Sequence, residues 1–126
     1  MKESRLDWRE SGELFNEIDF ELHGAVTLLN IHGDITSFSE PFLTEAYQNA
    51  NDQGASNILL KIDTDAYINS GGIAVLIQIL SQTRQNNQNI GIAGVSAHFK
   101  KIFSMVGITK FADIHDTVES AIEMMA

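Results

Sequence analysis

The stretch ILLKIDTDAYINSGGIAVLIQIL, residues 58–80, decides the fold of this chain. The near-continuous apolar run at 57–62 is typical of a central strand that is buried on both faces. The second apolar run predicts a helix over 71–86. In α/β domains, functional groups gather on loops that connect the carboxyl end of a buried strand to a helix. Ser70 lies at such a position, so its role is the first question.

The predicted helix 71–86 is more apolar than a surface helix needs to be. A single stripe suffices to bury one face, and here that stripe is expected to be Ile73, Leu76, Ile77 and Leu80. Further apolar residues lie outside it: Ala74, Val75 and Ile79. They are either covered by neighbouring elements or available to a partner, and the second interpretation predicts a partner-facing strip near Ala74 and Gln78.

Ser70 is placed to cap the amino end of this helix. A serine hydroxyl at that position accepts a hydrogen bond from a free amide of the first turn. The amides and the dipole of a helix amino terminus also favour negative charge. A phosphate on Ser70 would therefore cost little stability while adding about −1.5 to −2 charges to the surface.

The rest of the chain alternates between strands and helices. Residues 18–22 and 25–31 predict a hairpin around His23-Gly24, and Pro41 favours a helix over 41–51. Further strands are expected at 90–93 and 111–114. Further helices are expected at 97–106 and from Asp116, the expected N-cap with Glu119 three residues later. The expected buried positions of the helices at 41–51 and 97–106 are Phe42, Leu43, Ala46, Tyr47, Ala50, Phe99, Ile102, Phe103 and Val106.

This order predicts a single α/β domain over 18–126. Alternating strands and helices imply a mixed, mostly parallel sheet of about five strands, with an antiparallel edge hairpin and four helices. Residues 1–17 combine charges with sparse apolar residues and are expected to form an N-terminal extension.

Composition narrows the possible functions. The 126 residues carry a formal net charge of −9, which disfavours nucleic acid as a partner. There is no cysteine, so thiolate catalysis and zinc–thiolate sites are excluded. No apolar run approaches the roughly 20 residues of a membrane span, and the first residues do not resemble a signal peptide. We expect a cytoplasmic protein without membrane insertion.

Two motifs from other protein classes, a phosphatase and a phosphoacceptor receiver domain, fit the sequence less well. Asp63-Thr-Asp65 after an apolar strand resembles the motif of haloacid dehalogenase-like phosphatases, but Tyr67 stands where a threonine is usual. A response-regulator receiver needs an acidic pair where only Asp34 is present. The four histidines show no metal-ligand spacing, with His98 expected at the surface, and no phosphate-binding glycine loop is present. We therefore expect no catalytic residue, no metal and no cofactor.

Several segments together resemble the STAS family of anti-sigma-factor antagonists. The stretch YINSGGIAVL, residues 67–76, is similar to the signature of that family, in which an apolar pair precedes Asp or Asn, then Ser, Ser or Thr, and Gly. VTLLNIHGD at 26–34 and SAHFKKIFSMVGITKF at 96–111 are similar to further family segments. The resemblance covers about residues 18–126.

The resemblance implies a phosphorylation-switched binding module in a bacterial cytoplasm. In this family the serine is phosphorylated by a partner serine kinase that is also an anti-sigma factor and that binds the ATP. The unphosphorylated domain sequesters that kinase. Here the phosphoacceptor would be Ser70, with Asn69 in place of an acidic residue and Gly71 in place of a second hydroxyl. The implied partner-binding residues are Asp65, Tyr67, Asn69, Ser70, Gly71, Ala74 and Gln78.

The same resemblance leaves a second function open. Some STAS domains act as scaffolds or transporter-accessory subunits, by protein binding without phosphorylation. For either function the expected oligomeric state is a monomer or a weak dimer.

Overall fold

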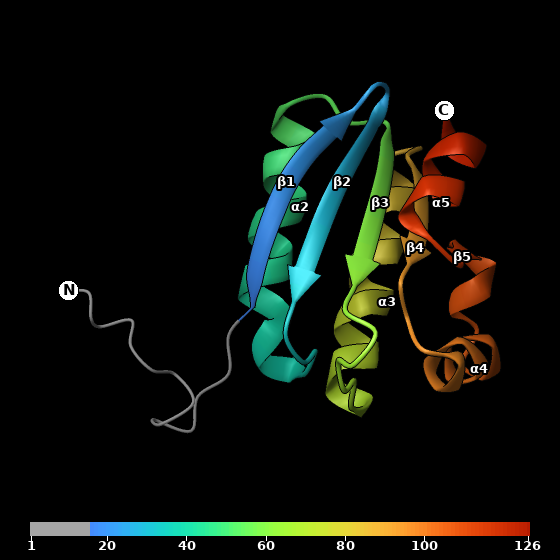
Figure 1. Ribbon diagram of the computed structural model, residues 1–126. Helices are drawn as coiled ribbons and strands as arrows, with labels where there is room; N and C mark the ends of the chain where they lie inside the picture. Colours follow the sequence, from blue (N-terminus) through green and yellow to red (C-terminus); the bar gives the residue numbers. More distant parts are fainter. Residues whose placement is uncertain (1–15) are drawn as a thin grey trace.

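The computed structural model describes residues 16–126 (Figure 1). The expected extension 1–17 lies outside the described residues except for Asn16 and Glu17. The strands are β1 (Glu17–His23), β2 (Val26–His32), β3 (Asn57–Ile62), β4 (Asn89–Ala93) and β5 (Asp113–His115). The helices are α2 (Glu40–Asp52), α3 (Ser70–Gln85), α4 (Ala97–Met105) and α5 (Val118–Met125), with short 3-10 turns η2 (Ser37–Ser39) and η3 (Ile108–Lys110).

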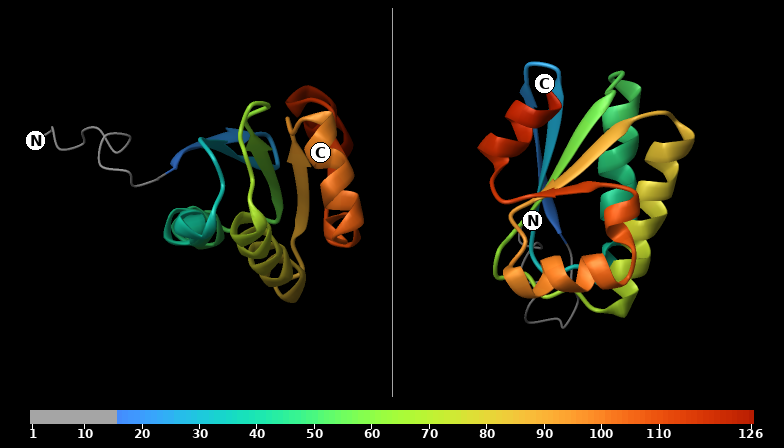
Figure 2. Two further views of the ribbon diagram at one scale, coloured as in Figure 1. Left: turned by 90° about the horizontal axis from the view of Figure 1, so that it is seen from below. Right: turned by 90° about the vertical axis from the view of Figure 1, so that its right-hand side faces the viewer.

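The five strands form one sheet in the order β1-β2-β3-β4-β5. β1 pairs with β2 antiparallel, and all later pairs are parallel. Helices α2 and α3 cover one face of the sheet, α5 covers part of the other, and α4 lies at the carboxyl end of the central strands (Figure 2). The predicted α/β fold with an antiparallel edge hairpin and four helices is confirmed. Within residues 16–126, no helix combines the length and apolar character that crossing a membrane requires.

The sheet separates two hydrophobic clusters of unequal size. Ile58, Leu60 and Ile62 of β3 point into the larger cluster, which α2, α3 and α4 complete. Leu59 points the other way, into the smaller cluster beneath α5, where it packs with Ala121 and Met125. β3 is thus buried on both faces, as its near-continuous apolar run predicts.

The buried stripe of α3 differs from the expected one. Its inward residues are Gly72, Val75, Leu76, Ile79, Leu80 and Thr83, whereas Ile73 and Ile77 are only half-buried. Gly72 sets this rotation because a Cβ atom there would lie 2.1 Å from the carbonyl oxygen of Ile35. The bare glycine must therefore face inward, so the predicted stripe is confirmed at Leu76 and Leu80, whereas Ile73 and Ile77 are half-buried and pack at the margin of the core.

Other sequence predictions need smaller corrections. The N-cap of α5 is Thr117, not Asp116: the Thr117 hydroxyl accepts from the amide of Ser120, and the Ser120 hydroxyl accepts from the amide of Thr117. Asp116 instead contacts Lys100. The last strand begins at Asp113, because η3 occupies 108–110. Val106 follows the end of α4 and is 45% exposed, so its expected burial is wrong.

The predicted buried face of α2 is confirmed. Leu43, Tyr47 and Ala50 are buried, and Phe42 and Ala46 are half-buried beside them. The helix begins at Glu40, one residue before the expected start, and Pro41 occupies its first turn. Thr36 and Ser39 form a capping box around η2, immediately before this helix.

We expect Gly72→Ala to lower the free energy of unfolding by about 2 kcal/mol or more. Alanine gains about 1 kcal/mol in helix propensity, but overpacking against a fixed backbone carbonyl costs more. Gly71→Ala is the matched control, because its Cβ would lie 3.0 Å from the Cβ of Ser37 and demands a smaller shift. Urea denaturation measures both variants. A Gly72→Ala variant as stable as the wild type would contradict this packing.

Candidate functional site

The candidate site is the loop between β3 and α3, together with the first turn of α3. Two ladder-like hydrogen bonds hold the loop against the chain that follows β2. The amide of Ile35 donates to the carbonyl of Tyr67 at 2.9 Å, and the amide of Asn69 donates to the carbonyl of Ile35 at 3.2 Å. An isolated parallel bridge pairs Ile35 with Ile68. The backbone leading to Ser70 is therefore held against the buried residue Ile35.

Side chains complete this support at the carboxyl edge of the sheet. The carboxylate of Asp34 accepts from the amide of Tyr67 at 2.9 Å, and that of Asp63 accepts from the amide of Gly33 at 3.2 Å. The hydroxyl of Thr64 donates to the carbonyl of Gly94 at 2.9 Å. The loop is thereby attached to the segments that follow both β2 and β4.

Asn69, not Ser70, is the N-cap of α3. The side-chain oxygen of Asn69 accepts from the amide of Gly72 at 2.8 Å, and its backbone is extended, with φ −93° and ψ −178°. Ser70 is the first residue of the helix and is exposed. The prediction that Ser70 caps the helix is wrong, because the residue before it takes that position. Among the described residues, no hydrogen bond occupies the Ser70 hydroxyl.

Gly71, which stands where the resembled motif has a second hydroxyl residue, packs against another element. A Cβ atom at Gly71 would lie 3.0 Å from the Cβ of Ser37 and 3.1 Å from its amide nitrogen. The 3-10 turn η2 therefore lies close against the first turn of α3. A hydroxyl-bearing side chain at position 71 would push η2 away.

The remaining predicted partner-binding residues lie on α3 or on the loop that precedes it. Ser70, Ala74 and Gln78 are all exposed and, at intervals of four, share one face of α3. Asp65 is exposed, and Tyr67 is 61% exposed. The ring of Tyr67 lies edge-on to that of Phe99 in α4, with 6.3 Å between centroids. Asn69 and Gly71 are half-buried beneath Ser70.

The structure adds one residue that the sequence did not indicate. Phe38 in η2 is 68% exposed, although a phenylalanine normally buries its ring. Because η2 packs on the first turn of α3, Phe38 lies near the amino end of the helix that begins at Ser70. We call the exposed set Phe38, Tyr67, Ser70, Ala74 and Gln78 the α3 docking face. The sequence does not predict the exposure of Phe38, because that exposure results from how η2 packs.

The two aspartates of the phosphatase-like pattern have different surroundings. Asp63 contacts His32 at 3.4 Å and Lys61 at 3.6 Å in addition to the Gly33 amide, whereas Asp65 is exposed. Asp63 thus links the carboxyl ends of β2 and β3. Nowhere in residues 16–126 do three or more His, Asp or Glu side chains gather in a way that could hold a metal ion. His98 is exposed, as predicted.

His32 lies between two carboxylates at the base of the loop. One ring nitrogen is 3.0 Å from Asp19 on β1, and the other is 3.4 Å from Asp63. The hydrogen bond to Asp19 is the main cause that raises the pKa of His32 above its usual 6.5, and the charges of Asp63 and Asp19 add to it, while burial opposes it. The His32 side chain therefore links the edge hairpin to the start of the loop.

Comparisons with known proteins agree on one family. The model of the STAS domain matches residues 17–121. The anti-sigma-B factor antagonist of Staphylococcus epidermidis is 21% identical over 91 residues, covering 72% of this chain and 84% of that protein. The corresponding protein of Staphylococcus aureus has the same identity and coverage.

Solved structures of low sequence identity share the fold. An anti-sigma factor antagonist from Mycobacterium paratuberculosis superposes with a TM-score of 0.72 at 16% identity, covering 87% of this chain and 93% of that one. The Bacillus cell fate determinant SpoIIAA in its phosphorylated form gives a TM-score of 0.61 at 14% identity, covering 87% of this chain and 100% of that one.

We expect Asn69→Ala to destabilise the protein by about 1 kcal/mol, because it removes the side-chain cap of α3. Asn69→Asp should match or slightly exceed wild-type stability, since a carboxylate keeps the cap and favours the helix dipole. Ser70→Ala is the control and should change stability little. Urea denaturation at neutral pH measures all three. If Ser70→Ala costs as much as Asn69→Ala, the cap assignment fails.

His32 makes stability depend on pH with a definite sign. Because the pKa of His32 is raised in the folded state, its contribution is fully present below about pH 6.5. That contribution is lost as the pH rises through the folded-state pKa. Asp19→Asn should lower the pKa of His32, followed by NMR titration of the imidazole, and flatten this part of the stability profile. Glu17→Gln, opposite His32 in register, should do neither. Equal effects of both variants would refute the pairing.

Proposed function

The chain belongs to the STAS domain family, and on that premise we propose that it is an anti-sigma-factor antagonist that acts by binding and not by catalysis. Unphosphorylated at Ser70, it sequesters a serine kinase that is also an anti-sigma factor. Phosphorylation of Ser70 by that kinase, which supplies the ATP site, releases it. The observation that carries the proposal is the exposed hydroxyl of Ser70 at the first position of α3, beside a cap supplied by Asn69.

This arrangement separates the modification from the fold. The cap does not involve the hydroxyl of Ser70, because the side-chain oxygen of Asn69 accepts the bond from the Gly72 amide. The amides of Ser70 and Gly71 donate to no group among the described residues, and such first-turn amides favour an anion. The positive end of the 16-residue helix α3 adds to this preference. A phosphate is therefore accepted locally.

The α3 docking face supplies the features of a protein interface. Phe38 and Tyr67 are large exposed aromatic side chains, the type that most often anchors an interface. Ala74 and Gln78 continue the surface along α3 with small or neutral side chains. A phosphate on Ser70 in this surface would have to be desolvated on binding, which opposes the complex. Release is thus achieved by charge, without refolding.

Asn69 and Gly71 are the positions that bear on the alternative function. Asn69 gives the cap without the carboxylate that is common in the family, so a kinase that reads that carboxylate would act slowly. If that phosphorylation is too slow to regulate binding, the domain works as a scaffold through the same face without phosphorylation. We place the action of either form in the bacterial cytoplasm, as a monomer or weak dimer.

Incubation with the kinase encoded beside its gene and with ATP should add about 80 Da to the peptide that contains Ser70. Mass spectrometry of the digested protein measures this, and Ser70→Ala should abolish the addition. Modification at another residue, or none with a kinase that binds the chain, would favour the scaffold function.

Ser70→Asp should weaken kinase binding about 100-fold, which corresponds to about 2.7 kcal/mol. Isothermal titration calorimetry measures the affinity. Ser56→Asp is the matched control, because Ser56 is also exposed but precedes β3 at the opposite end of the strand. Tight binding by Ser70→Asp, or equal weakening by Ser56→Asp, would contradict the switch.

A further inference from the structure

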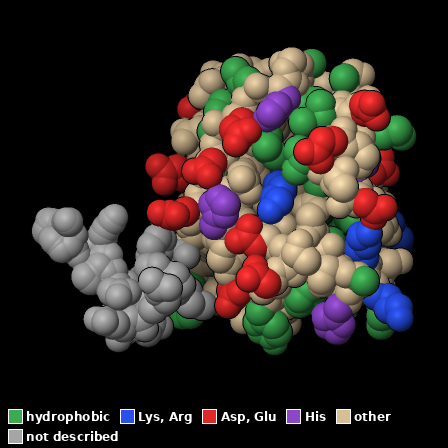
Figure 3. All heavy atoms as spheres, viewed as in Figure 1, with side chains coloured by type: hydrophobic (Ala, Val, Ile, Leu, Met, Phe, Trp, Pro, Cys, Tyr) green, Lys and Arg blue, Asp and Glu red, His purple; other side chains and the backbone are tan. Residues whose placement is uncertain are grey.

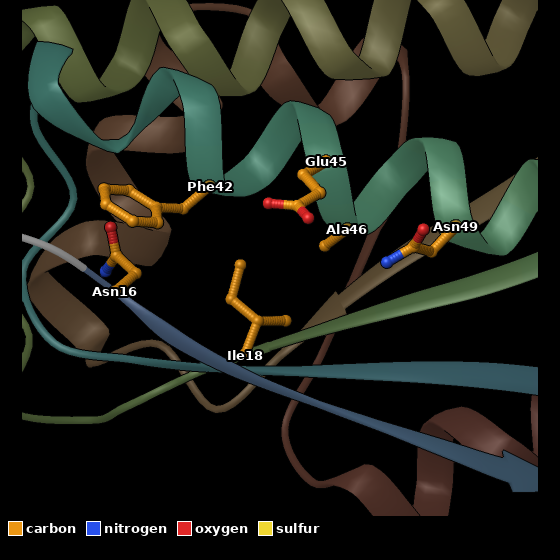
Figure 4. A pocket seen from close by; sticks show the side chains of 6 residues that line it. All are labelled: Asn16, Ile18, Phe42, Glu45, Ala46 and Asn49. Atoms are coloured by element: carbon orange, nitrogen blue, oxygen red, sulfur yellow. The ribbon is translucent and has the colours of Figure 1, made fainter.

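A pocket of about 250 Å³ lies between the edge strand β1 and helix α2. Asn16 and Ile18 line it from the strand side, and Phe42, Glu45, Ala46 and Asn49 line it from α2 (Figure 4). None of these residues belongs to the α3 docking face. The volume suits a small ligand or a single side chain, being below the roughly 300–1,000 Å³ of sites for drug-sized molecules.

Asn16 leaves an acceptor without a donor at this pocket. Asn16 is 5% exposed, and its side-chain nitrogen donates to the carbonyls of His32 at 2.9 Å and Asp34 at 3.0 Å. These two bonds turn the Oδ1 atom toward α2, on the side of Phe42 (Figure 4). That oxygen is buried and has no hydrogen-bond partner. An unsatisfied buried acceptor destabilises the protein, so a ligand donor that bonds to this oxygen would be bound favourably.

Glu45 supplies a negative charge at the same pocket. Its carboxylate points into the space between α2 and Ile18 (Figure 4). Among the described residues, no lysine, arginine or histidine pairs with it. The remaining walls are the ring of Phe42 and the aliphatic side chains of Ile18 and Ala46, with the amide of Asn49 at one end. The pocket thus combines hydrogen-bond acceptors, one carboxylate and an apolar lining.

The surrounding half of the protein reinforces this charge. Residues 16–60 contain no lysine or arginine and seven carboxylates: Glu17, Asp19, Glu21, Asp34, Glu40, Glu45 and Asp52. Figure 3 shows acidic side chains spread over the sheet face, whereas basic ones gather at the lower right, near α4, apart from one in the middle. The field at the pocket therefore attracts cations and repels anions.

We propose that this pocket binds an organic cation with a short apolar stem, namely a guanidinium or alkylammonium group. A guanidinium carries several donors in one plane, which suits a carboxylate and an amide oxygen together. Its charge-assisted bond to Glu45 is of the stronger kind, and an aromatic wall such as Phe42 favours a cation. Two sources have this chemistry: a free small molecule and an arginine side chain of a bound polypeptide.

The first experiment is an NMR titration of the full chain with N-ethylguanidinium, with N-ethylurea as the neutral isostere. We expect saturable amide shifts at residues 16, 18, 45, 46 and 49 with the cation and at least tenfold weaker binding of the urea. Absence of saturable shifts with N-ethylguanidinium, or equal binding of both probes, would overturn the proposal.

Variants on α2 provide the matched controls. Glu45→Gln should weaken the cation about tenfold, as expected for loss of a charge-assisted bond. Asp52→Asn removes the same charge from an exposed residue of α2 that does not line the pocket, and should leave affinity within about twofold. Ala46→Leu should abolish binding by filling the pocket. Equal weakening by Glu45→Gln and Asp52→Asn would show only general electrostatic attraction and would refute the site.

A final arm distinguishes the two sources. A blocked Gly-Arg-Gly peptide that binds at least tenfold more tightly than N-ethylguanidinium would identify an arginine-bearing polypeptide as the ligand. Equal or weaker binding of the peptide would identify the free cation. The titration requires neither the kinase nor a phosphate on Ser70, so its outcome is independent of the proposed function.

Discussion

The candidate site depends on the contacts that the backbone of Ile35 makes with the loop after β3 and with α3. Its amide and carbonyl bond to Tyr67 and Asn69, and its carbonyl oxygen lies so close to Gly72 that no Cβ could stand there. Ile35 itself is fully buried. One residue of the chain after β2 thereby fixes both the loop that leaves β3 and the rotation of α3. The exposed face of α3, including Ser70, follows from this single contact.

Because of this constraint, the helix cap and the proposed phosphoacceptor are different residues. With Gly72 held inward, the first turn starts at Ser70, and Asn69 is the residue whose side chain reaches the Gly72 amide. Ser70 then has an exposed hydroxyl at the positive end of a long helix. Such a position accepts a phosphate with little structural cost, while the neighbouring aromatic residues make that charge unfavourable within an interface.

Most of the fold could be predicted from local sequence patterns, because those patterns record burial directly. The apolar run of β3, the alternation in β1 and the proline of α2 each indicate an element without knowledge of the others. The phase of α3 could not be predicted, because α3 is apolar on adjacent faces and only the contact between Gly72 and Ile35 selects one.

The cap was misassigned for a similar reason. Asn69 and Ser70 are both favoured N-cap residues, so the local pattern does not distinguish them, and the same holds for Asp116 and Thr117 at α5. The exposure of Phe38 depends on how η2 packs against Gly71, which no local pattern encodes.

The most direct test is an NMR and urea-denaturation comparison of the chain with phosphoserine at position 70 and the unmodified chain. We expect stability unchanged within about 1 kcal/mol and amide shifts confined to residues 67–74. A larger loss of stability, or shifts spreading into β2 and the core, would show that Ser70 supports the fold and would contradict this separation of cap from switch.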